Sequence, residues 1–236
     1  MGSQGGFIGR IGNVIHYKMG DKYYSRSLPK KYKQTKGTKA KSAEFGLAST
    51  IGMLIRRGLQ SVIFENADRK MQFSLVGEIY TWLQRARHQP ASKITQPQFG
   101  FFQFSTASPA LSARWLVDLK VSQPVHGQIK IAIPSFIPKT NFRAPASATG
   151  VVCRIASMVI DVENKKEIGS TQNEISYTID KNKVPAQNII QELPMPAGSL
   201  LVTGLCLEYF VVRHQLKVQT HDKIFKPSQI IYAVHN

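Results

Sequence analysis

The spacing of apolar residues differs between the middle of this chain and its C-terminal half, and the difference separates two kinds of secondary structure. Between residues 51 and 83 apolar side chains recur every three or four positions, which is the period of an α-helix. After residue 110 they alternate with polar ones, which is the period of a β-strand. We therefore predict an α+β chain with a basic head (1–90), a linker (91–110) and a β-sandwich (111–236).

The head is predicted to contain an antiparallel helical pair. Thr38 is a plausible N-cap for the first helix, Asn66 for the second, and Pro90 ends the second. The apolar positions of the first helix are Ile51, Leu54, Ile55, Leu59, Val62 and Ile63. Those of the second helix are Val76, Ile79, Tyr80 and Leu83.

A β-hairpin is predicted ahead of these helices. Two short β-rich runs, 13–18 and 22–26, flank a turn that contains Gly20. The glycines before them have two interpretations: an anion-binding nest beside Arg10, or a tight or bulged strand that approaches another backbone. We favour the strand, because no helix follows at once. These glycines are Gly6, Gly9 and Gly12.

Beyond the linker, short alternating runs separated by Pro, Gly and Asn predict an immunoglobulin- or fibronectin-III-like β-sandwich. Trp115 and Tyr209 are expected core anchors, and 134–150 is expected to be a surface loop. The linker phenylalanines are expected to pack onto a surface. The predicted strands are 115–121, 128–133, 151–162, 174–179, 189–193, 200–212 and 230–234.

Positive charge is concentrated in the head. The chain has 31 Lys and Arg against 14 Asp and Glu, a net charge of +17, and 18–41 holds nine cations against Asp21 alone. This run is interpretable as a solvated loop, a phosphate-binding surface with interleaved tyrosines, or a docking arm for an acidic subunit. The candidate contact residues are Arg10, Lys18, Lys22, Arg26, Lys30, Lys31, Lys33, Lys36, Lys39 and Lys41.

Motifs for catalysis are missing from the sequence. It has no phosphate-binding loop, no Gly-x-Ser-x-Gly elbow and no zinc-protease motif, so we assign no catalytic residue, metal site or cofactor. Cys153 and Cys206 lie in apolar runs, and we favour free buried thiols over a disulfide. An enzyme of unknown class is therefore the least favoured alternative.

The opening of the chain resembles a known family. Residues 5–18 read GGFIGRIGNVIHYK and residues 24–29 read YSRSLP. Together they resemble an uncharacterised, domain-of-unknown-function family common in Bacteroidetes, which usually has Lys at the position of Arg10 and a small residue at that of His16. The resemblance implies the two-part layout and a bacterial or phage-related source. It carries over no functional residue.

These observations predict a non-enzymatic structural or interaction protein that is a component of a larger assembly. Its expected partners are protein subunits, either copies of itself or other chains, with the basic head against a polyanion or an acidic subunit. The alternative is a nucleic-acid-binding protein that acts through the basic hairpin and loop (10–41). Because the opening residues do not read as a secretory signal and no run suits a membrane span, we expect no membrane insertion and a location in the cytoplasm or an assembled particle.

Overall fold

The structure is a computed structural model that describes residues 7–28, 35–63, 70–88, 97–125, 127–214, 216–220 and 222–236. It is a mixed α+β fold with three antiparallel sheets. The chain divides into two compact units, Met1–Lys41 and Ser42–Asn236. This division differs from the predicted one at 90–110, because the apolar stripes of the helices are buried against the strands and share a core with them.

The first unit contains a three-stranded sheet, called here the N-terminal sheet. Its strands β1 (Gly9–Ile11), β2 (Val14–Met19) and β3 (Lys22–Ser27) lie in chain order. Two-residue turns join them, with Gly12 at φ +56° and Gly20 at φ +62°, values that favour glycine. The predicted hairpin is confirmed, and β1 extends it. Gly9 lies in a strand, as the favoured interpretation requires, and Gly6 lies outside the described residues.

Three helices follow: α1 (Lys36–Gly58), α2 (Gln60–Ile63) and α3 (Met71–His88). The first predicted apolar stripe is fully buried, and in the second Val76 and Ile79 are buried. The predicted cap at Thr38 is wrong. The side chain of Thr35 accepts a hydrogen bond from the backbone N–H of Thr38 at 3.2 Å, so the helix begins before Thr38. Asn66 and Pro90 lie outside the described residues.

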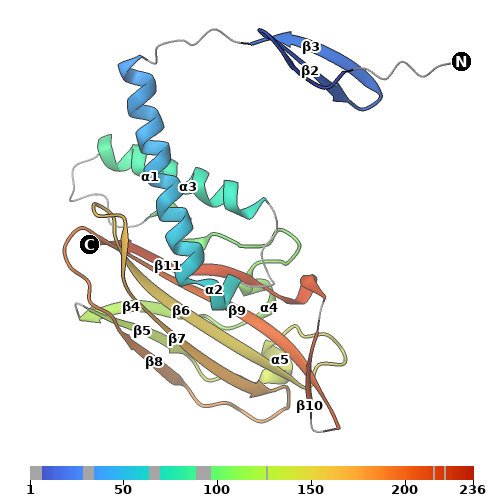
Figure 1. Ribbon diagram of the computed structural model, residues 1–236. Coiled ribbons are helices and arrows are strands. Elements are labelled where there is room, and N and C mark those ends of the chain that lie inside the picture. The colour runs from blue at the N-terminus through green and yellow to red at the C-terminus, as the bar shows by residue number, and fades with distance from the viewer. Residues whose placement is uncertain are drawn as a thin grey trace, which may run out of the picture. The chain divides into compact units, whose positions relative to one another are not determined.

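The second unit, called here the body, has three layers (Figure 1). The helices cover one face of a five-stranded sheet with the order β10-β9-β6-β7, in which β11 also pairs with β9. A three-stranded sheet, β4-β5-β8, covers the other face. The large sheet consists of β6 (Gly150–Asp161), β7 (Lys166–Thr178), β9 (Ser199–Arg213), β10 (Leu216–Gln219) and β11 (Ser228–His235). The small sheet consists of β4 (Lys120–Val125), β5 (Gln128–Ile133) and β8 (Gln187–Glu192).

Each interlayer space is filled by its own core. Even-numbered residues of β6 and β9, such as Met158 and Val202, pack against the helices, and odd-numbered ones, such as Ile155 and Leu205, pack between the two sheets. This follows from the alternation of side chains along a strand. The central strands of the large sheet, β6 and β9, are therefore mostly apolar on both faces, which explains the nearly continuous burial of β9.

Two predicted segments differ from the structure. The strand predicted at 115–121 is wrong for its first five residues: a short helix, α4 (Leu111–Arg114), precedes Trp115, and β4 begins only at Lys120. The connection 134–150 is not only a surface loop. It contains α5 (Pro138–Asn141) and buries Phe136 and Phe142, which contact Trp115 with ring centroids 5.7 and 5.2 Å apart. Trp115 forms only an isolated β-bridge, with Phe142, so burial in this aromatic cluster accounts for the apolar pattern around Trp115.

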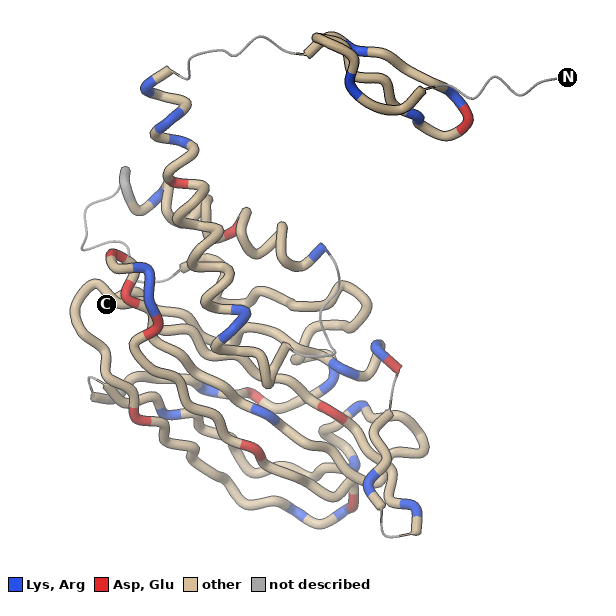
Figure 2. Tube along the Cα trace, in the orientation of Figure 1, with Lys and Arg blue, Asp and Glu red and all other residues tan. Residues whose placement is uncertain are grey.

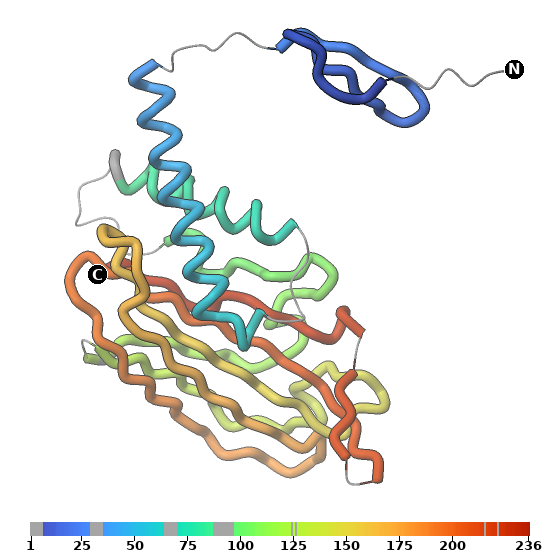
Figure 3. The backbone as a smooth tube through the Cα atoms, viewed as in Figure 1, coloured from blue at the N-terminus to red at the C-terminus, as the bar shows by residue number. Residues whose placement is uncertain are grey.

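The described part of the linker, 97–110, packs onto the body, and the prediction that its phenylalanines are covered holds for Phe102 and Phe104 but not for Phe101. After a 3-10 turn, η3 (Gln98–Phe101), this segment runs beside β11 (Figure 3). The backbone N–H of Phe104 donates to Ser228 O at 2.9 Å, and that of Ile230 donates to Phe102 O at 2.8 Å. Phe99 and Phe104 are buried in the helix-facing core, whereas Phe101 is 77% exposed.

Candidate polyanion-binding surface

The register of the N-terminal sheet brings three predicted contact residues onto one face. Arg10 pairs with Ile15, which pairs with Arg26, and Met19 pairs with Lys22 at the turn. Residues directly opposite one another in adjacent strands point to the same face, and so do residues two apart. Arg10, Lys22 and Arg26 therefore share one face, called here the cationic face.

A pair of tyrosines lies on the cationic face between these cations. Tyr17 and Tyr24 are directly opposite each other, and their rings are stacked, with centroids 5.7 Å apart and an interplanar angle of 23°. The guanidinium of Arg26 lies 5.7 Å from the centroid of the Tyr17 ring, within the range of a cation–π interaction. Cations and rings thus alternate along this face.

The opposite face of the same sheet differs in charge. It has one cation, Lys18, whose ammonium lies 5.7 Å from the centroid of Tyr23. His16 Nδ1 is hydrogen-bonded to the Ser25 hydroxyl at 2.7 Å. The edge of Phe7 packs against the His16 ring at 5.9 Å between centroids. This face is therefore polar and aromatic with little charge.

The described cations of the first unit are not neutralised by carboxylates of the same unit. Asp21 is the only Asp or Glu in this unit, and among its described residues no ion pair is formed. Figure 2 shows how few acidic positions accompany the basic ones here. The exposed cations are Arg10, Lys18, Lys22, Arg26, Lys36, Lys39 and Lys41.

Three predicted contact residues occupy the beginning of α1. Lys36, Lys39 and Lys41 are exposed there, and the first turn has no acidic residue. Cations at a helix N-terminus are unfavourable, because the helix dipole places partial positive charge at that end. Lys30, Lys31 and Lys33 lie outside the described residues.

The segregation of charge between the two faces was missed at the sequence level. Face assignment depends on register, because a shift of one residue moves every side chain to the other side of the sheet. The useful signal was the length of the turns. Gly12-Asn13 and Gly20-Asp21 both suit two-residue hairpin loops, which fix the register of the flanking strands.

A pocket of about 460 Å³ beside the β6–β7 turn contains residue types that a hydrolase uses, including Asp161, Ser199 and His235. Their geometry does not form a catalytic triad. His235 pairs with Leu200, so it shares a face of the sheet with Leu200, whereas the adjacent Ser199 points to the other face. Asp161 pairs with Ser199 and lies on that other face too. The serine and histidine side chains therefore do not converge.

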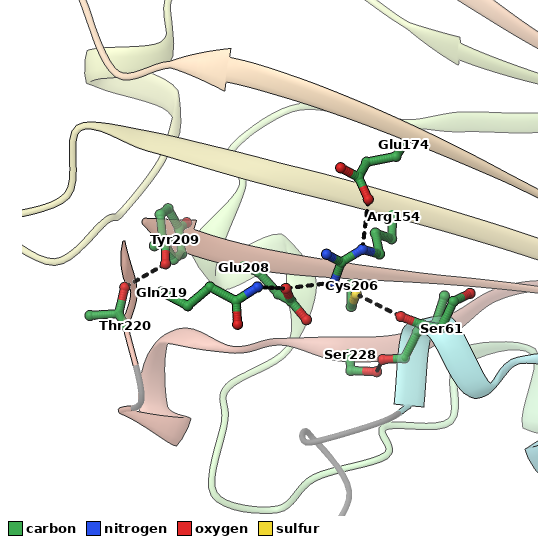
Figure 4. A network of polar contacts seen from close by, with 10 residues as sticks. Ser61, Arg154, Glu174, Cys206, Glu208, Tyr209, Gln219, Thr220 and Ser228 are labelled. Atoms are coloured by element: carbon green, nitrogen blue, oxygen red, sulfur yellow. Dashed lines mark hydrogen bonds and ion pairs between the residues drawn. The ribbon is translucent and has the colours of Figure 1, made fainter. Parts of the chain in front are cut away.

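A polar network on the large sheet contains two carboxylates that are paired with one cation (Figure 4). Arg154 bridges Glu174 at 2.9 Å and Glu208 at 2.5 Å, and Gln219 donates to Glu208 at 3.0 Å. Burial lowers the pKa of Arg154, but the two glutamates raise it by more, so its pKa is raised overall. Both carboxylates are paired with the Arg154 guanidinium. The three side chains therefore link neighbouring strands and do not form an acid–base pair.

The two cysteines are free and buried, as predicted. They belong to adjacent strands but to opposite faces: Cys153 pairs with Leu207 in the intersheet core, and Cys206 pairs with Arg154 on the helix side. Burial raises the pKa of Cys206 to about 12, so its thiol stays protonated and unreactive at neutral pH.

Within the described ranges, no group of three His, Cys, Asp or Glu side chains is placed to hold a metal ion. In that same part of the chain, no helix has the length and apolar content needed to cross a bilayer. No protein-family model matches the sequence, and a search of curated proteins finds no match.

Proposed function

We propose that this chain is a non-enzymatic interaction protein whose N-terminal sheet binds a polyanion, within a larger assembly. The observation that carries the proposal is the cationic face: Arg10, Lys22 and Arg26 are exposed on one side of a small sheet, and none of them pairs with a carboxylate of the described residues. Such a surface attracts polyanions and speeds their association.

The small size of the sheet supports the same proposal. Few of its side chains are shielded: Ile11 is 59% exposed and Met19 is 64% exposed. Sheets of this size gain stability when they pack one face against a partner. A bound polyanion or an acidic subunit would relieve the charge repulsion between the cations and bury part of this surface.

We infer that the body has an immunoglobulin- or fibronectin-III-like sandwich. In this proposal the body is the scaffold to which the N-terminal sheet is attached. The strand order supports this inference. Counted from β4, the first, second and fifth strands of the body (β4, β5 and β8) form one sheet. The third, fourth and sixth strands (β6, β7 and β9) belong to the other sheet, in which β10 and β11 both pair with β9 and together take the place of a seventh strand. Domains of this kind commonly present binding loops and edges while their cores stay inert.

We further propose membership of the Bacteroidetes family whose Gly-rich opening the chain resembles, and a location in the cytoplasm or an assembled particle. The resembling segment, 5–18, covers β1 and most of β2, so the motif coincides with the proposed binding sheet. Two free buried cysteines suit a reducing compartment.

The proposal is tested by measuring heparin binding to the full chain as a function of NaCl concentration. The triple variant Arg10→Glu, Lys22→Glu, Arg26→Glu is expected to lose binding, and single Glu variants should reduce the salt slope by about 0.7–0.9 for each phosphate-like contact removed. The control is Lys166→Glu, Lys181→Glu, Lys183→Glu, three exposed cations of the body with the same change in charge. A flat salt dependence, or an equal loss in the control, contradicts the proposal.

A further inference from the structure

We infer that the polyanion is a single-stranded nucleic acid, held on the cationic face with Tyr17 and Tyr24 as the platform on which its bases stack. This inference rests on the proposed function. It adds the class of ligand, the face of the sheet and the role of each residue type.

The first step is the order of side chains along the face. Arg10, Ile15 and Arg26 form one row, the stacked tyrosines form the next, and Met19 with Lys22 forms the third. Neighbouring rows are two residues apart, which is about 7 Å along a strand. A cation row thus lies on each side of the ring pair. An unpaired strand carries phosphates alongside unstacked bases, so it can meet both kinds of row at once.

The second step concerns the accessibility of the rings. Tyr24 is the more open of the two, at 37% exposure, and its partner Tyr17 is held by the stack and by the Arg26 contact. A ring that is fixed in place loses little conformational entropy when a base stacks on it. Sheet surfaces that display aromatic side chains are a recurring platform for single strands.

The third step separates the three candidate polyanions. In a duplex the faces of the bases are occupied by their neighbours in the stack, so the tyrosines would have nothing to contact. An acidic protein surface offers carboxylates that satisfy Arg10, Lys22 and Arg26 but makes no special use of two adjacent rings. Only an unpaired nucleic acid uses the cations and the tyrosine pair together.

The same sheet supplies a matched control. Tyr23 is adjacent to Tyr24 in β3, is 45% exposed and also has a cation near its ring, but it lies on the opposite face. Replacing either tyrosine with isoleucine keeps a residue that favours strands and removes the aromatic ring. A loss caused merely by weakening the sheet would affect both variants.

The experiment measures binding of the full chain to an oligothymidylate of about 12 nucleotides, to a duplex of similar length, to heparin and to polyglutamate. Tyr24→Ile is expected to weaken oligothymidylate binding by about five- to a hundredfold, the range for the loss of one base–aromatic stack. Tyr23→Ile should change it less than twofold, and Tyr24→Trp should preserve or strengthen it. Heparin binding should be the same in all three variants.

Each contrary result has a distinct meaning. Equal effects of Tyr24→Ile and Tyr23→Ile on oligothymidylate, or a duplex bound as tightly as the single strand, overturn the inference and leave polyanion binding in place. Polyglutamate bound more tightly than oligothymidylate also overturns it and identifies an acidic protein as the ligand. If none of the four probes binds, the proposed function fails, and the inference fails with it.

Discussion

A buried polar network crosses the core between the two sheets of the body. The Ser157 hydroxyl is hydrogen-bonded to the side chains of Gln191 and Thr203, the latter at 2.8 Å, and Gln191 donates to Asn173 Oδ1 at 2.7 Å. Ser157, Thr203 and Gln191 are at most 2% exposed. Buried polar groups are costly when unpaired, but a satisfied network favours one arrangement of the strands that provide it. This network therefore specifies how β8 sits against the large sheet.

Replacing Gln191 with leucine is expected to reduce the free energy of unfolding by about 1–3 kcal/mol, because it removes two hydrogen bonds and leaves Asn173 without this donor. The triple variant Ser157→Ala, Thr203→Val, Gln191→Leu should be less destabilised than the three single variants added together, since it leaves fewer polar groups unpaired. Urea denaturation measures both, with the exposed neighbour Glu192→Gln as a control that stays within about 0.5 kcal/mol. Strict additivity would show that the network is not cooperative.

At the scale of helices and strands, the sequence predicted elements with strong periodicity and missed those without it. The observed bounds of β5 equal the predicted ones, because its residues alternate strictly between buried and half-buried. The first half of β7 was missed, since 166–173 is mostly polar on both faces. β10 was missed because it has only four residues, all of them exposed, which is too short a run for its alternation to stand out. The same holds for the candidate site. Its positive charge was predicted from composition, but the assignment of its residues to one face of the sheet depends on strand register, which the apolar pattern does not give.

The packing of α1 against the large sheet can be tested with two helical glycines. A Cβ on Gly58 would overlap Met158 Sδ and lie 3.1 Å from Met158 Cβ, whereas a Cβ on Gly77 of α3 would have no neighbour within 4 Å. Gly58→Ala is expected to destabilise the protein by about 1–3 kcal/mol, because Met158 is fully buried and overpacking forces it to move. Gly77→Ala should stabilise it by about 0.5–1 kcal/mol through helix propensity. Thermal denaturation of both variants decides the matter, and a stabilising Gly58→Ala would refute the close approach.

At the scale of the whole molecule, the two units depend on different sources of stability. Both hydrophobic cores are formed by residues from Leu47 onward, so no side chain of the N-terminal sheet contributes to either. The body buries two apolar layers, and the N-terminal sheet leaves most of its side chains exposed. The molecule thus combines a body that is stabilised by two hydrophobic cores with a small charged sheet that has few buried contacts.

The body is therefore expected to fold without the N-terminal unit. A chain that begins at Ser42 should unfold within about 4 °C of the full chain, which corresponds to about 1 kcal/mol for a protein of this size. Far-UV circular dichroism during heating measures the transition. A loss of cooperativity, or a fall of more than about 10 °C, would mean that the first 41 residues stabilise the cores in a way that the burial pattern does not reveal.

The covering of the large sheet by helices that precede it in the chain has a consequence during translation. Ile55 of α1 is synthesised about 100 residues before Met158 of β6, which packs against the helices in the same core, and β9 follows later still. At about 5–20 residues per second, the apolar stripe of α1 stays exposed for about 5–20 s before the strands that bury it are synthesised. Nascent chains of this protein should consequently be clients of ribosome-associated chaperones.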